Sequence, residues 1–132
     1  MFAGETIMLV DDDDRNIFAL SAVLRARARG AKLAIAKDGV QCLELLRQNN
    51  RVCIVLLDMM MPVMDGYQTL NEIRGDDNLK HLKVIALTAQ AMKGDMERCI
   101  EAGADDYCSK PVNIDELLKK IELLKQKKSE NA

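Results

Sequence analysis

The run VCIVLL, residues 52–57, decides the fold class of this chain. Its residues are all apolar, without the alternation that marks a strand with one face in water, so it predicts a strand buried on both faces. Strands of that kind belong to parallel sheets, in which helical crossovers cover both faces. Similar but shorter runs lie at residues 7–10, 33–36, 84–87 and 107–108.

Segments with helical periodicity separate these five runs. The clearest is Ile114–Leu124, where apolar residues recur every three or four positions and Lys and Glu lie opposite. Asp65 with Gln68, and Asn113 with Glu116, have the spacing of a capping box at a helix start. Strict alternation of five strands and five helices predicts an α/β fold with a doubly wound parallel sheet. The other helical segments lie at residues 17–24, 40–46, 67–73 and 92–100.

Composition restricts the classes of function. A chain of 132 residues fits one domain, and we expect it over residues 1–128 with a disordered tail at 129–132. A net charge of -2 gives no field to attract nucleic acid, and we expect no membrane contact. Four cysteines without a Cys-x-x-Cys pair, beside one histidine, argue against a zinc site and favour buried thiols in a reducing cytoplasm.

Acidic residues follow the ends of two predicted strands. Asp11 and Asp12 begin a run of four aspartates after the first strand, and Asp58 follows the third. Thr88 and Lys110 follow the fourth and fifth strands. Ligands of an open α/β sheet bind beyond the carboxyl ends of its strands, where the strand order reverses. If the first and third strands flank that reversal, their acids meet in one crevice beside a hydroxyl and an ammonium.

Such a group of carboxylates has a chemical use. Close carboxylates repel one another unless a cation joins them, and their hard oxygens suit Mg²⁺, with Mn²⁺ as a second possibility. Mg²⁺ takes only one or two protein carboxylates, which leaves another free to attack phosphorus. Lys110 and Thr88 could then neutralise and bind the transferred group, so the pattern favours phosphoryl transfer.

The motifs MLVDDD, VLLDMMMPVMDG, VIALTA and DYCSKP resemble the four signatures of the response-regulator receiver domain of two-component signalling. They occur in family order, and the resemblance covers about residues 6 to 125. It implies a flavodoxin-like sheet with strand order 2-1-3-4-5. It also implies a phosphoryl donor, either a histidine kinase or a histidine phosphotransfer protein, and a downstream protein of unknown identity.

The resemblance assigns roles to the residues at the metal and acceptor site. Asp58 would accept the phosphoryl group from a phosphohistidine. Asp12 would bind Mg²⁺ directly, Asp11 mainly through water, and Met60 through its backbone carbonyl. Lys110 would pair with the phosphoryl oxygens.

Further roles concern the switch. Thr88 would swing toward the phosphoryl group and Tyr107 would turn inward after it, changing the face formed by the fourth helix, fifth strand and fifth helix. The bond before Pro111 is typically cis in this family. Met60 and Gln90 occupy the positions at which the family tunes access of hydrolytic water.

Two other functions fit parts of the pattern. Asp11-Asp12-Asp13 satisfies the Asp-x-Asp of haloacid-dehalogenase-like phosphatases, although no acidic motif follows Lys110. A degenerate receiver that only binds proteins would lack one of the functional positions, and here all are filled. The receiver is expected to catalyse its own phosphorylation and dephosphorylation. The resemblance is closest to receivers of hybrid histidine kinases, so the chain is either part of such a kinase or a stand-alone regulator.

Several charged residues are expected to have only structural roles. Asp13 and Asp14 suit the start of the first helix, where acids cap and interact with the helix dipole. Asp105 and Asp106 are predicted in a solvated turn, and the lysines between residues 119 and 128 on a solvated helix face.

Overall fold

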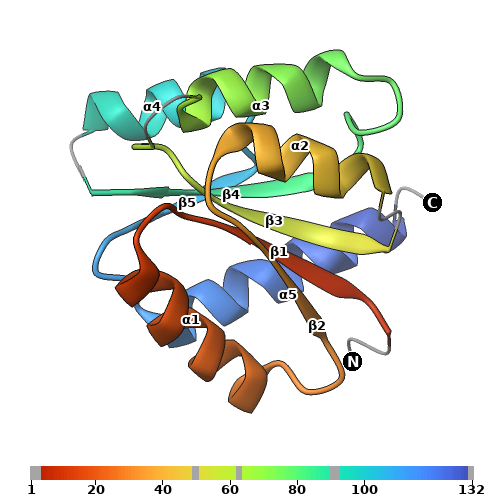
Figure 1. Ribbon diagram of the computed structural model, residues 1–132, viewed down its shortest axis with the longest axis vertical. Helices are drawn as coiled ribbons and strands as arrows, with labels where there is room; N and C mark the ends of the chain where they lie inside the picture. Colours follow the sequence, from red (N-terminus) through yellow and green to blue (C-terminus); the bar gives the residue numbers. More distant parts are fainter. Residues whose placement is uncertain (1–3, 49–50, 62–63, 90–92, 131–132) are drawn as a thin grey trace.

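The computed structural model describes residues 4–48, 51–61, 64–89 and 93–130 (Figure 1). Strands and helices alternate along the chain, and the strands form one parallel sheet in the order β2-β1-β3-β4-β5. This confirms the predicted doubly wound, flavodoxin-like α/β fold. The elements are β1 (Thr6–Val10), α1 (Asp14–Arg27), β2 (Lys32–Ala36), α2 (Gly39–Gln48), β3 (Val52–Asp58), α3 (Gly66–Gly75), β4 (Lys83–Thr88), α4 (Lys93–Glu101), β5 (Asp106–Ser109) and α5 (Ile114–Glu130).

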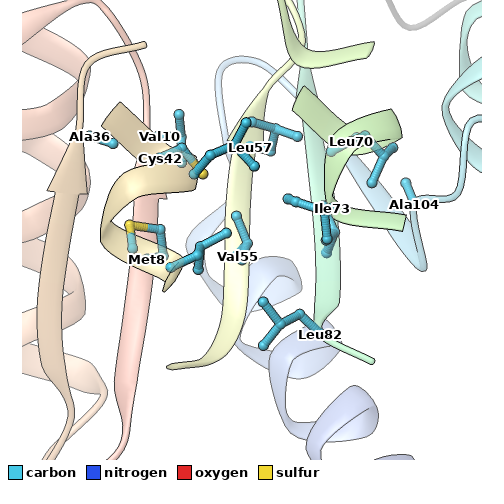
Figure 2. Packing of buried hydrophobic residues seen from close by; sticks show 14 of the residues in the cluster. Met8, Val10, Ala36, Cys42, Val55, Leu57, Leu70, Ile73, Leu82 and Ala104 are labelled. Atoms are coloured by element: carbon cyan, nitrogen blue, oxygen red, sulfur yellow. The ribbon is translucent and has the colours of Figure 1, made fainter. Parts of the chain in front are cut away.

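The sheet separates two hydrophobic cores (Figure 1). Helices α1 and α5 cover one face, and α2, α3 and α4 cover the other. Strand β3 supplies both cores because its side chains alternate: Val55 and Leu57 face the α2–α3–α4 side, and Ile54 and Leu56 face the other. Figure 2 shows Val55 and Leu57 among side chains of the core on the α2–α3–α4 side. All of β3 is buried, as its unbroken apolar run predicts.

Helix boundaries agree with most of the local signals. Asp65 and Gln68 form the predicted capping box at the start of α3. The Asn113 side chain accepts a hydrogen bond from the Glu116 amide at 3.1 Å. Gly30 and Gly103 follow α1 and α4 with φ of 86° and 116°, a conformation that favours glycine.

The C-terminal end differs from its prediction. Helix α5 extends to Glu130, so residues 129 and 130 are helical where a tail was expected, and residues 131–132 lie outside the described part. Within the described residues, no helix has both the length and the apolar character needed to cross a membrane. All four cysteines are buried, and none of them forms a disulfide.

Asp105 lies in a bend and is exposed, in agreement with the predicted solvated turn, but its side chain also makes specific contacts. Its carboxylate accepts hydrogen bonds from the Val84 amide at 2.8 Å and from the Arg74 guanidinium at 3.0 Å. Arg74 also donates to the backbone carbonyls of Lys80, Leu82 and Gly103. We call Arg74 and Asp105, with these carbonyls, the Arg74 cluster. It ties α3 to the segment before β4 and to the turn between α4 and β5.

Candidate phosphoryl-acceptor and metal site

Two strands bring the predicted acids together at the carboxyl edge of the sheet. Strands β1 and β3 are neighbours, with Val10 beside Leu57, so the residues that follow them project into the same crevice. Asp11, Asp12 and Asp58 each offer a carboxylate oxygen, and these oxygens lie within 4.8 Å of one another. Asp11 and Asp58 are buried, whereas Asp12 is exposed. The sequence-predicted cluster therefore exists in the fold.

Local hydrogen bonds orient the two buried carboxylates. Asp11 Oδ1 accepts from the Asp13 amide at 2.9 Å, and Asp58 Oδ1 accepts from the Met60 amide at 3.0 Å. In both residues the other oxygen, Oδ2, faces Lys110. Asp13 also caps α1 through its side chain, which accepts from the Arg15 amide, so its structural prediction is confirmed.

Lys110 is the cation of this cluster. Its Nζ lies 3.3 Å from Asp11 Oδ2 and 3.4 Å from Asp58 Oδ2. Burial raises the pKa of Asp58 above its usual value, and repulsion from Asp11 adds to this, while the Met60 amide and Lys110 oppose it. One ammonium thus contacts two members of a cluster of three carboxylates, and the cluster carries an excess of negative charge.

The donor set fits a hard divalent cation. Carboxylate oxygens from three residues, all within 4.8 Å of one another, are the kind of ligand that Mg²⁺ and Mn²⁺ accept. The exposure of Asp12 leaves one side of the cluster open to solvent, as Mg²⁺ requires because it retains several waters.

The remaining predicted residues surround this crevice. Thr88 ends β4 and is buried, next to Ser109 of β5 in the sheet register. The peptide bond between Lys110 and Pro111 is cis. The Met60 side chain is exposed.

Two predictions made for this region lie outside the described residues. These are Gln90, as one of the two positions at which the family tunes access of hydrolytic water, and Met92, as the first apolar position of the helical segment at residues 92–100.

Tyr107 lies farther along the edge strand β5. Its side chain is partly buried against the core on the α2–α3–α4 side of the sheet. Its ring lies over Lys120 of α5, with 4.9 Å between Nζ and the ring centroid. Lys120 is 18% exposed in its side chain, so the prediction that the α5 lysines form a solvated face is wrong at this position.

Gly66 is a site residue whose role the sequence reading missed. It begins α3, and a Cβ built on it would lie 2.4 Å from Met59 Cα and 2.7 Å from the Asp58 carbonyl oxygen. Only glycine therefore lets α3 start against the backbone that carries the candidate acceptor. The Asp-Gly pair of the motif VLLDMMMPVMDG was the available signal, but only its aspartate was interpreted, as part of a capping box.

Comparison with known proteins defines the class. The chain belongs to the response regulator receiver domain family, whose sequence profile matches residues 7–122. It is therefore a receiver domain of two-component signalling, and receiver domains accept phosphate from histidine kinases or phosphotransfer proteins. The phosphatase and degenerate-receiver alternatives are not favoured.

Individual relatives are a small regulator and parts of large kinases. The polar-differentiation response regulator DivK of Brucella anthropi is 32% identical over 117 residues, which cover 89% of this chain and 93% of DivK. The peroxide stress-activated histidine kinase mak1 of Schizosaccharomyces pombe is 33% identical over 120 residues, 87% of this chain but 7% of the kinase.

A solved structure extends the comparison to the metal. The receiver domain of sensor histidine kinase PA1611 from Pseudomonas aeruginosa PAO1 has 35% identity and a TM-score of 0.83. The alignment covers 94% of this chain and 99% of that one. That crystal structure has a magnesium ion coordinated in its active site cleft.

Proposed function

We propose that Asp58 of this receiver accepts a phosphoryl group from a phosphohistidine, with Mg²⁺ held by Asp11, Asp12, Asp58 and the Met60 backbone carbonyl. The observation that supports this most strongly is the group of three carboxylates within 4.8 Å, two of them buried and in contact with one lysine. A purely structural cluster gains nothing from an excess of buried negative charge, whereas a site for a cation requires it.

Asp58, Lys110 and Thr88 have different roles in the transfer. An oxygen of Asp58 attacks phosphorus as the P–N bond to the donor imidazole breaks, and the imidazole keeps the bonding electron pair. Lys110 exchanges its contacts with Asp11 and Asp58 for the phosphoryl oxygens, and Thr88 donates a hydrogen bond to one of them. Bound Mg²⁺ would neutralise the remaining charge on those oxygens; Mn²⁺ suits the same donors.

The donor is a histidine kinase or a histidine phosphotransfer protein, in keeping with the kinases among the relatives. A mostly apolar groove of about 270 Å³ beside the crevice, lined by α1 and by Lys110–Val112, offers such a protein a place to dock. Phe18 on α1 is 78% exposed. Aromatic side chains are enriched in protein interfaces, so Phe18 is a candidate contact for the donor.

Phosphorylation is expected to act through Thr88 and Tyr107. The added charge would draw the Thr88 hydroxyl toward the phosphoryl group and let the Tyr107 ring turn inward, changing the α4–β5–α5 face read by a downstream protein. The parent protein is either a small regulator, as DivK is, or a larger histidine kinase, as mak1 is.

Intact-protein mass spectrometry after incubation with acetyl phosphate and Mg²⁺ tests the assignment. The chain should gain the mass of one phosphoryl group, and Asp58→Asn should gain none. Asp14→Asn, an exposed neighbour in the same aspartate run, should be labelled like the wild type. Chelation of the metal should abolish labelling. Labelling of Asp58→Asn at the wild-type level, or turnover of generic phosphate esters that it retains and Asp11→Asn loses, would contradict the proposal.

A further inference from the structure

We propose that Lys120 is a positioning residue for the Tyr107 switch, acting as a latch that holds the ring at the outer edge of β5. This inference rests on the proposed function, because it assumes that Tyr107 moves when Asp58 is occupied. Lys120 lies thirteen positions along the chain from Tyr107, on α5, and contacts both its backbone and its ring.

The backbone of Tyr107 is held by side chains. Its amide donates to Asp106 Oδ1 at 2.8 Å, and its carbonyl accepts from Lys120 Nζ. In a strand the amide and carbonyl of one residue point to the same side. Strand β5 is the last strand of the sheet in the described chain, so we place Asp106 and Lys120 at its outer edge. They cover backbone groups that an edge strand otherwise exposes.

The same ammonium also lies beside the ring. A lysine Nζ 4.9 Å from a tyrosine centroid makes a cation–π interaction, which is stronger when the cation is partly desolvated. Lys120 meets this condition, with its side chain 18% exposed. The ring is therefore attracted toward the side of β5 that faces away from β4 and from the acceptor crevice.

Two acids keep the ammonium in place and charged. Glu116, one turn earlier on α5, lies 3.0 Å from Nζ, and Asp106 lies 3.6 Å away. Burial lowers the pKa of Lys120, but the hydrogen bond to Glu116 and the nearby negative charges outweigh it, so the pKa is above its ordinary value. Lys120 consequently stays a cation at neutral pH.

An inward turn of the ring must break one contact and keep the other. The carbonyl of Tyr107 stays with the strand, so its bond to Lys120 survives, whereas the ring leaves the ammonium. Lys120 thus opposes the inward turn without being needed for phosphoryl transfer itself, and it sets how much occupancy of Asp58 is required to move Tyr107.

Tyrosine NMR can measure this directly, because Tyr67 and Tyr107 are the only tyrosines in the sequence. Tyr67→Phe assigns the two ring signals. Beryllofluoride with Mg²⁺ is then titrated into the wild type, Lys120→Met, Lys120→Arg and Lys119→Met while the Tyr107 signal is followed. Lys119→Met is the matched control, since it removes the same charge from an exposed neighbour on α5. Thermal unfolding verifies that each variant is folded.

We expect Lys120→Met to lower the beryllofluoride concentration at the midpoint by about two- to tenfold, the range of one cation–π contact. Lys120→Arg, which keeps the cation and the donors, should restore a midpoint near the wild type. A midpoint for Lys120→Met equal to that of Lys119→Met, or higher, would overturn the latch. A Tyr107 signal that never moves in a wild type that is phosphorylated at Asp58 would also overturn it, and would leave phosphoryl acceptance intact. Absence of phosphorylation would instead refute the proposed function.

Discussion

The two ends of α3 lie against two clusters of charged side chains that are built differently. At its start, Gly66 abuts the backbone of Asp58, whose carboxylate shares Lys110 with Asp11. Near its end, Arg74 pairs with Asp105 and donates to three backbone carbonyls. The second cluster matches charge with charge and donor with acceptor, whereas the first holds more carboxylates than cations. A cluster with balanced charges stabilises the fold, whereas a cluster with more carboxylates than cations is suited to bind a cation.

The largest expected effect is at the matched cluster. Arg74→Met removes the donor to three carbonyls and the ion pair with Asp105, so the free energy of unfolding should fall by about 3 kcal/mol. Urea denaturation measures the change. Arg98→Met is the control, because Arg98 is exposed on α4 and lies over the Tyr67 ring, a contact worth about 1 kcal/mol or less. Equal losses of unfolding free energy in the two variants would show that the Arg74 cluster stabilises the fold no more than the exposed contact of Arg98 does.

A second test compares backbone crowding at the two ends of the same helix. Gly66→Ala places a methyl group 2.4 Å from Met59 Cα and should lower the unfolding free energy by about 2 kcal/mol, since backbone must move. Gly75→Ala meets no atom within 4 Å, and the Gly75 φ is outside the left-handed region, so it should be neutral or stabilise by up to about 1 kcal/mol. Thermal or urea unfolding of both variants decides. A stable Gly66→Ala would mean that α3 does not need its close approach to the acceptor loop.

The same substitution, Asp to Asn, should change the free energy of unfolding in opposite directions in the two clusters. Without divalent cations, Asp58→Asn removes a buried, repelled charge and should raise the unfolding free energy by about 1 kcal/mol. Asp105→Asn weakens the pairing with Arg74 and should lower it by about 1 kcal/mol. Urea unfolding in a chelator gives both values. Added Mg²⁺ should then stabilise the wild type and not Asp58→Asn, because only the complete site binds it well. Shifts of the same sign in the chelator would remove the distinction between the clusters.

The smallest effect at neutral pH is expected at a third kind of buried group, which has no opposite charge. Burial in α2, with a contribution from Asp38, raises the pKa of the Cys42 thiol from 9.0 to about 12. The folded state therefore keeps a proton that the unfolded state loses above about pH 9, so this stability is present at lower pH and is lost between pH 9 and 12. The unfolding free energy of the wild type should fall more steeply than that of Cys42→Ala in this window. Parallel curves would contradict the assigned shift.

The sequence was sufficient to predict most of the fold and the composition of the acidic cluster. Apolar runs such as Val52–Leu57 predict strands, and the residues after each run must lie at the carboxyl edge, so the sequence alone predicts that Asp11, Asp12 and Asp58 lie together.

The features that the sequence did not reveal are contacts between elements far apart in the chain. The local Gly-Ala-Asp-Asp context predicts the exposed turn at Asp105, but it does not predict the pairing with Arg74, 31 residues away. Lys120 was read with its neighbouring lysines, yet helical period turns it toward the edge of β5. Periodicity gives the face of a helix, but it does not give the distance across which a long side chain finds its partner.

The complete burial of β3 has a consequence for how a signal leaves Asp58. A strand with both faces in hydrophobic cores and a neighbour on each side is among the last parts of a domain to open, so its amide hydrogens should exchange with solvent only when the whole domain unfolds. The candidate acceptor Asp58 therefore lies at the end of one of the most stable strands of the domain. A conformational change that starts at Asp58 must therefore take place in the surrounding loops and side chains, while β3 keeps its position.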